Sequence, residues 1–146
     1  MKNQLIAFAL LLCFTSSCKK TISKSPVPNG NYSGVLEVSS SIYKTPSIYP
    51  ITITFENEKY KISPDSARKE VGGSGTYSSN GNIGNFNDEN AWPVGADSNL
   101  ILNGEYEIQS KGNNLILKKQ FKGDTPIGPA VTIIQVYYRY ILTKNK

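Results

Sequence analysis

Regular alternation of apolar and polar residues is the feature that most constrains this chain. In residues 48–55, which read IYPITITF, every second residue is apolar and threonines occupy positions between them. The same alternation returns in residues 58–63 and in residues 131–143. A period of two places successive side chains on opposite faces of a β-strand. The sequence therefore predicts half-buried strands, and no segment has the pattern of a long helix.

Turn signals between these segments indicate that neighbouring strands form hairpins. Residues 57–58 make a short turn, so residues 48–63 are a predicted hairpin. In Ser79-Asn80-Gly81, the Asn-Gly pair readily supplies the positive φ angles of a primed turn. Lys111-Gly112-Asn113 predicts another turn, and residues 125–129 predict a loop rich in Pro and Gly.

The chain after residue 30 is predicted to form eight strands, joined by turns and two irregular segments. We expect them at residues 31–38, 48–55, 58–63, 73–78, 82–86, 100–109, 114–120 and 131–143. Residues 64–71 could hold one helical turn or a loop, and residues 87–99 form a long irregular segment. An antiparallel meander must bury one face and protect its edges, and closure into a barrel does both. The predicted fold class is all-β, a single eight-stranded antiparallel up-and-down barrel, with a two-sheet sandwich as the alternative.

The N-terminus has the layout of an export signal. After Lys2, residues 5–14 form an apolar run that is too short to span a bilayer as a stable helix, and small residues then lead to Cys18. This resembles the bacterial lipobox, although Thr15 stands where that motif favours leucine. The resemblance implies that residues 1–17 are a removable signal peptide and that Cys18 carries palmitate-type acyl chains. An ordinary secretory signal or an anchor helix is the alternative.

The residues after Cys18 predict a flexible tether and then the folded domain. Residues 18–29 are rich in Lys, Ser, Thr and Pro, which is typical of a linker. Residues 30–146 form the predicted barrel domain. The Ser-Cys-Lys-Lys start resembles lipoproteins of the Bacteroidota, in which acidic residues at these places are associated with surface export. Lys19 and Lys20 occupy them here, so we expect an anchor in the outer membrane with the barrel on the periplasmic side.

Composition excludes several functions. The chain has no histidine, and its two cysteines are Cys18 and Cys13, which would leave with the signal. Triad catalysis, His-based zinc sites and thiol redox chemistry therefore lack their side chains. Glu105 and Glu107 share the solvated face of one strand, which poorly supports a paired-carboxylate hydrolase. The net charge of +5 is spread along the chain instead of forming the stripe of a nucleic-acid binder. We expect no enzyme, no cofactor, no metal, no nucleic-acid partner and a monomer.

Three glycine–tyrosine motifs give the chain a family resemblance. Residues 30–34 (GNYSG) open the first strand, and Gly75-Thr76-Tyr77 and Gly104-Glu105-Tyr106 follow before a Tyr-rich last strand. Over residues 30–144 the chain resembles small lipocalin-like (calycin-type) lipoproteins of Bacteroidota. Lipocalins carry Gly-x-Trp with a late Arg packed over the Trp, where this chain has Tyr32 and Arg139, the latter on the polar face. The resemblance implies a barrel that binds a small apolar or amphipathic ligand inside.

Aromatic residues are the candidate ligand contacts. Tyr77, Tyr106 and Tyr138 are predicted to point inward, and Phe86 and Trp92 are the other two candidates. Inward tyrosines can line a cavity and orient an amphipathic ligand. Barrels of this size can equally be filled by their own side chains. Trp92 could plug one end of the barrel or line the mouth of a pocket.

The irregular segment also holds Asp88, Glu89 and Asp97, and carboxylates can bind calcium. Their spacing matches no calcium loop, so we expect them to cap turns. The predicted function is non-catalytic binding of a small hydrophobic ligand by a membrane-anchored envelope lipoprotein. The alternative is a protein-interaction or inhibitor module that acts through its loops. A cavity lined by Tyr and Leu would favour the first function, and a packed interior with an exposed aromatic loop around Trp92 would favour the second.

Overall fold

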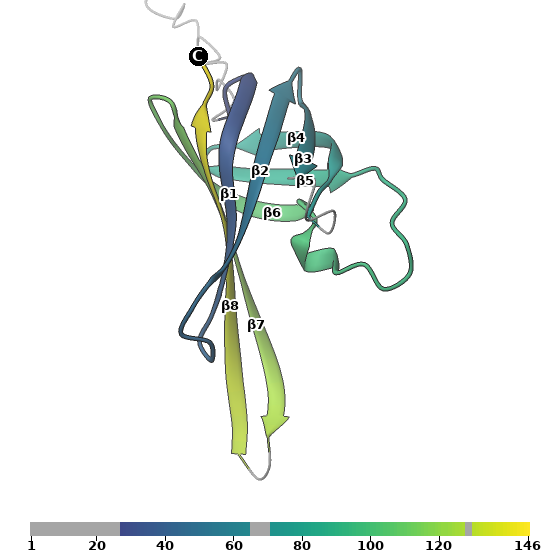
Figure 1. Ribbon diagram of the computed structural model, residues 1–146, viewed down its shortest axis with the longest axis vertical. Coiled ribbons are helices and arrows are strands. Elements are labelled where there is room, and N and C mark those ends of the chain that lie inside the picture. The colour runs from purple at the N-terminus through teal and green to yellow at the C-terminus, as the bar shows by residue number, and fades with distance from the viewer. Residues whose placement is uncertain (1–26, 65–70, 128–129) are drawn as a thin grey trace, which may run out of the picture.

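The structure is a computed structural model that describes residues 27–64, 71–127 and 130–146, with no side chains described for residues 120–134. Eight antiparallel strands pair in chain order, and β8 pairs with β1 to close the barrel (Figure 1). The predicted all-β barrel is therefore confirmed. The strands are β1 (Gly30–Ser40), β2 (Ser47–Glu56), β3 (Lys59–Pro64), β4 (Ser74–Asn80), β5 (Ile83–Asp88), β6 (Gly104–Lys111), β7 (Asn114–Ile127) and β8 (Ala130–Lys144), with a 3₁₀ turn η1 (Ser98–Leu100) before β6.

Primed turns join the short hairpins; the sequence predicted a short turn at residues 57–58 and a primed turn at residues 79–81. Asn57 and Glu58, between β2 and β3, have φ angles of 49° and 63°, the two positive values of a type I′ turn. Between β4 and β5, Asn80 pairs with Ile83, so the turn is Gly81-Asn82 and lies one residue later than expected. Gly81 at φ 61° is the first central residue, which is the type II′ arrangement.

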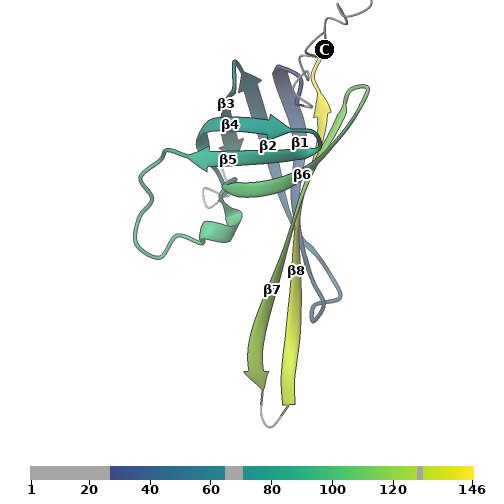
Figure 2. The same ribbon diagram turned by 180° about the vertical axis from the view of Figure 1, so that it is seen from behind.

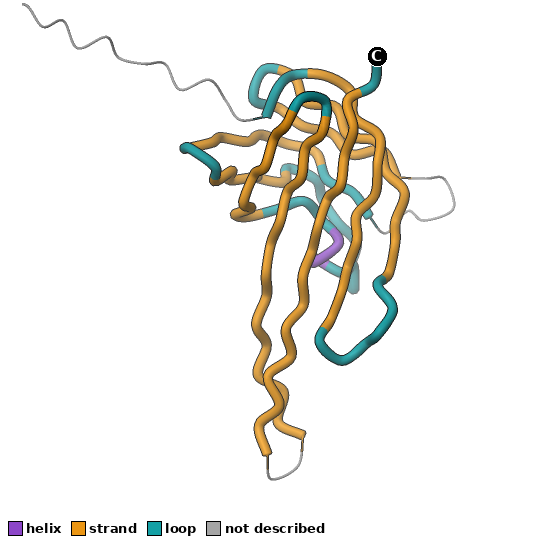
Figure 3. The backbone as a smooth tube through the Cα atoms, turned by 90° about the vertical axis from the view of Figure 1, so that its left-hand side faces the viewer, coloured by secondary structure: helices purple, strands orange, loops and turns teal. Residues whose placement is uncertain are grey.

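The last hairpin is longer than the sequence suggested. Residues 125–127 were expected to lie in a loop, but they pair with residues 130–132 and extend β7. Pairing of β8 with β1 ends at Ser40, and pairing of β7 with β6 ends at Glu107. Beyond these points β7 and β8 pair only with each other and form a two-stranded arm that leaves the barrel (Figures 1 and 3).

The predicted strand at residues 100–109 is wrong in its first part. Leu100 ends η1, Ile101 makes a single bridge to Gly72, and β6 begins only at Gly104. Leu100, Ile101 and Leu102 are all buried. Three consecutive buried side chains are incompatible with a strand that keeps one face in solvent. Of the helical turn or loop expected at residues 64–71, residues 65–70 lie outside the described residues.

The core consists of the side chains on the apolar parity of each strand. Successive buried positions alternate with solvent-facing ones in β2, β3 and β6, as expected from their sequences. The side chains with less than 2% exposure are Val27, Tyr32, Leu36, Ile53, Phe55, Val71, Leu102, Tyr106, Leu115, Leu117, Tyr140 and Leu142. Each buried Leu, Ile or Phe contributes about 1.5–3 kcal/mol relative to an exposed one. This core has to stabilise the barrel without a disulfide between described residues.

Two glycines mark the places where strands approach most closely. A Cβ atom at Gly34 in β1 would lie 2.0 Å from the carbonyl oxygen of Ile141 in β8. A Cβ atom at Gly75 in β4 would lie 2.0 Å from the carbonyl oxygen of Asn87 in β5. Strands β4, β5 and β6 run across the direction of β1, β2, β7 and β8, as Figure 2 shows. The missing side chains allow the sheet to bend sharply into this arrangement.

Both described chain ends are attached to the same end of the barrel. Val27 is buried, and the hydroxyl of Tyr32 donates to the carbonyl of Pro28 at 2.8 Å. The ammonium of Lys144 donates to the carbonyl of Asn29 at 2.6 Å. Residues 27–29, which we expected to belong to the tether, therefore pack against the barrel. The end of the chain lies opposite the β7–β8 arm (Figure 1).

Candidate functional site

Three of the predicted ligand contacts pack against one another inside the barrel. Tyr77, Phe86 and Tyr106 are buried. The ring centroid of Phe86 lies 5.7 Å from that of Tyr77 and 5.6 Å from that of Tyr106. Further ring contacts extend this series at both ends, to Phe55 and to Tyr140. Aromatic pairs at these distances are in van der Waals contact. The interior is therefore filled by side chains at these positions, and packing is favoured over a cavity.

Burial also keeps the interior tyrosines in their neutral form. Desolvation raises the pKa of Tyr60, Tyr106 and Tyr140 above the usual tyrosine value. The Tyr60 hydroxyl donates to the carbonyl of Leu102 at 2.5 Å. The Tyr140 hydroxyl is the one buried side-chain polar atom without a hydrogen-bond partner in the described part of the chain. The hydrogen-bonded hydroxyl of Tyr60 stabilises the core, and the hydroxyl of Tyr140 strains it. Neither tyrosine can serve as an acid or a base near neutral pH.

Trp92 lies away from the other candidates and closes a loop. Its indole nitrogen donates to Asp88 Oδ2 at 2.5 Å, and its ring covers Gly72, where a Cβ atom would lie 2.8 Å away. The other carboxylate oxygen of Asp88 accepts from the backbone nitrogen of Ser74 and from the side-chain amide of Asn90, both at 2.9 Å. Trp92 and Asp88 together fix the irregular segment to β4. This geometry favours the plugging role over a pocket mouth.

The acidic residues of that segment are spread among different contacts. Asp97 accepts from the backbone nitrogen of Asn99 at 2.9 Å and caps η1, as expected. Glu89 accepts from the hydroxyl of Thr76 at 3.3 Å. Over the described ranges, no group of three or more His, Cys, Asp or Glu side chains could hold a metal ion.

Lys119 is an inward-facing charge that the sequence reading did not identify. It pairs with the buried Tyr138, so its side chain lies on the apolar parity of β7. Its ammonium donates to the carbonyl of Asn103 at 2.8 Å and lies 5.3 Å from the centroid of the Tyr106 ring. Burial lowers the pKa of Lys119. The side chain spans the gap that opens where β6 and β7 separate. The sequence does contain a signal for this orientation, because Lys119 follows Leu117 by two positions and therefore falls on the same face of the strand.

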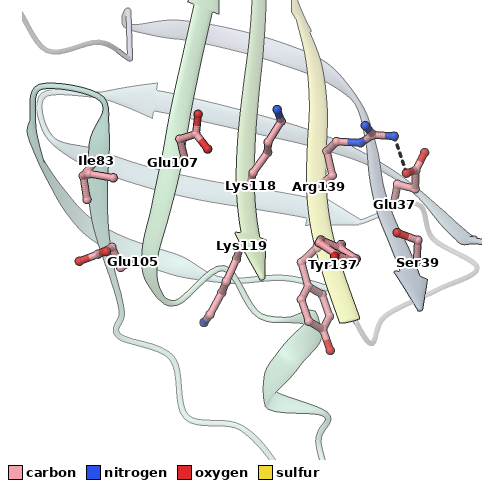
Figure 4. A pocket seen from close by; sticks show the side chains of 10 residues that line it. Glu37, Ser39, Ile83, Glu105, Glu107, Lys118, Lys119, Tyr137 and Arg139 are labelled. Carbon is pink, nitrogen blue, oxygen red and sulfur yellow. Dashed lines mark hydrogen bonds and ion pairs between the residues drawn. The ribbon is translucent and has the colours of Figure 1, made fainter. Parts of the chain in front are cut away.

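A groove of about 770 Å³ lies on the outside of the barrel and is lined by residues of β1, β5, β6, β7 and β8 (Figure 4). A row of directly paired neighbours crosses it. Ile83 pairs with Glu107, Glu107 with Lys118, Lys118 with Arg139, and Arg139 with Glu37. Residues paired in this way lie about 4.5–5.5 Å apart at Cβ. The row therefore presents two cations in the middle and a carboxylate on each side.

Among the described residues, one ion pair fixes this row. Arg139 Nη2 lies 2.6 Å from Glu37 Oε1, and the Arg139 side chain is still 45% exposed. Arg139 thus lies on the polar parity expected from the sequence and does not pack over Tyr32. Lys118 makes no ion pair with another described residue. Two like charges directly opposite each other disfavour the sheet, so the Lys118–Arg139 pair leaves positive potential at the centre of the groove.

A second row lies beside the first. Tyr137 in β8 pairs with Ser39 in β1, and both line the groove together with Glu105 of β6. The Tyr137 side chain is 40% exposed, and its hydroxyl donates to Gln135 Oε1 at 2.7 Å. Tyr138 also lines the groove, and it is the one predicted site residue that does so.

The groove was not predictable as a site. Glu105, Glu107 and Arg139 were recognised as solvent-facing, but their neighbours depend on the register between distant strands. Cys18 lies outside the described residues, so its lipidation stays a prediction. Among the described residues, no helix has the length and apolar character needed to cross a membrane. No family model, no curated protein and no solved structure matches this chain.

Proposed function

We propose that this protein is a lipid-anchored, non-catalytic binding module of the bacterial cell envelope that takes its ligand in the outer groove. The observation that carries the proposal is the contrast between the two faces of the sheet. Inside, aromatic rings contact one another in series from Tyr32 to Tyr140. Outside, a groove of about 770 Å³ falls within the usual size of ligand sites.

The location of the groove changes the kind of ligand from the one expected on sequence. Six of its ten lining residues are of charged types: Glu37, Glu105, Glu107, Lys118, Lys119 and Arg139. Such a surface favours a polar ligand that can hydrogen-bond, because an apolar molecule would leave these groups without water or partners. The apolar ligand implied by the lipocalin resemblance requires interior space that the ring contacts occupy.

The anchor part of the proposal is supported by the N-terminal sequence and by the short connection to the barrel. Between Cys18 and the buried Val27 there are eight residues. Acylation at Cys18 would hold the barrel next to the membrane, since two or three acyl chains give stable attachment. We place the anchor in the outer membrane, with the barrel in the periplasm.

Exposed apolar residues in two loops favour a second candidate function, a protein-interaction module. Between β1 and β2, Ile42 is 48% exposed and Tyr43 is 75% exposed. In the irregular segment, Val94 is fully exposed. Exposed aromatic and aliphatic side chains in loops are typical anchors for a protein partner.

Fluorine NMR of the acylated mature chain, residues 18–146, in lipid nanodiscs tests the proposed site. Incorporation of 3-fluorotyrosine places reporters at Tyr137 and Tyr138 in the groove and others at Tyr77 and Tyr106 inside. We expect a polar oligosaccharide probe to shift Tyr137 and to leave the interior signals unchanged. Shifts of Tyr77 and Tyr106 with decanoate, without a response at Tyr137, would show that the interior is the binding site. The same preparation shows acylation by intact mass, with Cys18→Ala as the unmodified control.

A further inference from the structure

We propose that the outer groove binds an acidic saccharide, with a carboxylate of the ligand over Lys118 and Arg139 and a sugar ring beside Tyr137. This inference rests on the proposed function and names the ligand class for the same groove. It uses the two rows of outward side chains that the register brings together (Figure 4).

The central cations select an anionic group. Lys118 and Arg139 are direct cross-strand neighbours. Glu37 occupies only Nη2 of the guanidinium among the interactions of the described residues, and Arg139 remains 45% exposed. An arginine fork has five N–H donors in a plane, so it can bind a carboxylate of the ligand while it holds Glu37. An anion at this place would also relieve the repulsion between the two cations.

The flanking carboxylates select a ligand that also donates hydrogen bonds. Glu105 and Glu107 line the groove and make no ion pair with another described residue. A carboxylate accepts hydrogen bonds only, so the complementary groups on the ligand are hydroxyls or amines. Purely anionic ligands such as nucleic-acid backbones would place phosphates against these two carboxylates. A ligand that combines one carboxylate with several hydroxyls satisfies both parts of the row.

Tyr137 supplies the flat apolar surface that a sugar ring needs. It lies two residues before Arg139 on the same face of β8, about 6.6–6.8 Å along the strand. Its ring is 40% exposed, and its hydroxyl is already engaged with Gln135, which restrains the ring. An aromatic ring with an apolar face and a polar rim suits the C–H face of a saccharide.

The sheet itself argues against an extended peptide. Peptides that bind sheets usually add a strand to a free edge, where backbone N–H and C=O groups are unpaired. Along the charged row, β6, β7, β8 and β1 are all paired to their neighbours. The charged row itself therefore offers side chains, because the strands that carry it are paired to one another there, and this favours recognition through ligand hydroxyls over recognition through a main chain at the row.

Titration of the acylated, fluorotyrosine-labelled chain tests this ligand class. The probe is trigalacturonate, which has three carboxylates on hydroxylated rings. Maltotriose is the neutral saccharide control, and tricarballylate is the anionic control that lacks a sugar. We expect trigalacturonate to shift Tyr137 with a dissociation constant below about 10 mM, and we expect each control to bind at least about tenfold more weakly.

Matched variants locate the interaction. Lys118→Gln should weaken trigalacturonate binding about tenfold, since it removes a charge-assisted contact. Lys111→Gln removes the same charge from an exposed residue of β6 outside the groove, and it should leave binding unchanged. Arg139→Gln could disturb the fold by freeing Glu37, so the Lys118 variant carries the conclusion. Tyr137→Leu should weaken binding of trigalacturonate and leave the residual binding of tricarballylate unchanged.

The outcomes separate this inference from the proposed function. Equal binding of maltotriose, equal binding of tricarballylate, or unchanged binding by Lys118→Gln would overturn the acidic saccharide. If no saccharide shifts Tyr137 but a peptide or decanoate does, the ligand class is wrong and the groove remains the binding site. If none of these probes shifts Tyr137, both the ligand class and the groove are wrong.

Discussion

The hydroxyl of Tyr60 on β3 donates a 2.5 Å hydrogen bond to the carbonyl of Leu102, a residue 42 positions further along the chain. This bond crosses a weak part of the barrel, because β3 and β4 share only three paired positions. The backbone nitrogen of Leu102 also donates to the carbonyl of Gly72 at 3.1 Å. Residues 100–102 thus connect β3 to the segment that enters β4. They hold this part of the barrel together, as a longer series of strand pairs does between the other strands.

Removal of the Tyr60 hydroxyl should therefore destabilise the fold. We expect Tyr60→Phe to lower the free energy of unfolding by about 1–3 kcal/mol, because the buried Leu102 carbonyl loses its partner. Tyr140→Phe is the matched control, since that buried hydroxyl makes no well-formed hydrogen bond among the described residues and interacts mainly with the side chain of Tyr106, so its removal should cost less stability than that of the Tyr60 hydroxyl. Urea unfolding measures both. Equal losses in the two variants would contradict the assigned role of Tyr60.

Gly34 should tolerate no side chain. Its Cβ position lies 2.0 Å from the carbonyl oxygen of Ile141, and backbone atoms cannot move aside as a flexible side chain can. We expect Gly34→Ala to destabilise the protein by about 3 kcal/mol or more and to weaken the closure between β1 and β8. Ser33→Ala, one residue away on the exposed face, should have little effect. Hydrogen exchange of β8 amides would show the loss, and unchanged protection in Gly34→Ala would refute it.

Alkaline pH should unfold the protein. Burial raises the pKa of Tyr60, Tyr106 and Tyr140 in the folded state, whereas in the unfolded chain they lose protons near pH 10. Above pH 10 the folded state binds more protons than the unfolded state, so stability falls as pH rises. Burial lowers the pKa of Lys119, which works in the opposite direction, but it is one group against five tyrosines whose pKa is raised, since the pKa of Tyr32 and of Tyr138 is raised by burial as well.

Tyrosinate absorbance followed during an alkaline titration measures this effect. We expect a cooperative step in which buried tyrosines ionise together with the loss of β-sheet circular dichroism. Tyr140→Phe should make the dependence of stability on pH less steep. Ionisation of all tyrosines before any loss of circular dichroism would mean that the interior is open to solvent.

Asp88 should control the environment of Trp92. Asp88→Asn keeps the shape of the side chain but removes the charge that accepts from the indole and from Ser74 and Asn90. We expect the free energy of unfolding to fall by about 1–3 kcal/mol, because hydrogen bonds to charged groups are among the stronger ones. Trp92 fluorescence should shift to the red as the ring enters solvent. Glu89→Gln is the control, and an equal shift in that variant would argue against the Asp88 contact.

Local chemistry explains which parts of the fold were predictable. The alternation in IYPITITF places Ile51, Ile53 and Phe55 inside without any knowledge of the neighbouring strands, and Asn57-Glu58 specifies its own turn. The strand predicted at residues 100–102 was wrong because this segment is held by contacts with β3 and with Gly72, which are distant in sequence. The extension of β7 past Gln120 was missed because Pro and Gly at residues 126–129 suggested a loop.

The candidate site depends even more on register. Glu37 and Arg139 are 102 positions apart and become neighbours only when β8 closes onto β1. Lys118 and Glu107 meet in the same way across the β6–β7 hairpin. Each side chain could be assigned to the solvated face from its own strand, but a row of four charges is a property of four strands aligned together. The sequence could therefore name Tyr138 as a site residue and could not name the row beside it.

The alternation along each strand also separates the residues that make the fold from the residues that line the groove. In β8, Tyr140 and Leu142 are buried and belong to the fold, whereas Tyr137 and Arg139 face the groove. Substitutions at the second set need not disturb the first, although the two sets are interleaved in one short stretch of the gene. Because the interior of the barrel is filled by buried side chains, the outer surface can acquire specificity for a new ligand through substitutions at every second codon of a strand. The buried residues between them, which make the barrel fold, can stay unchanged.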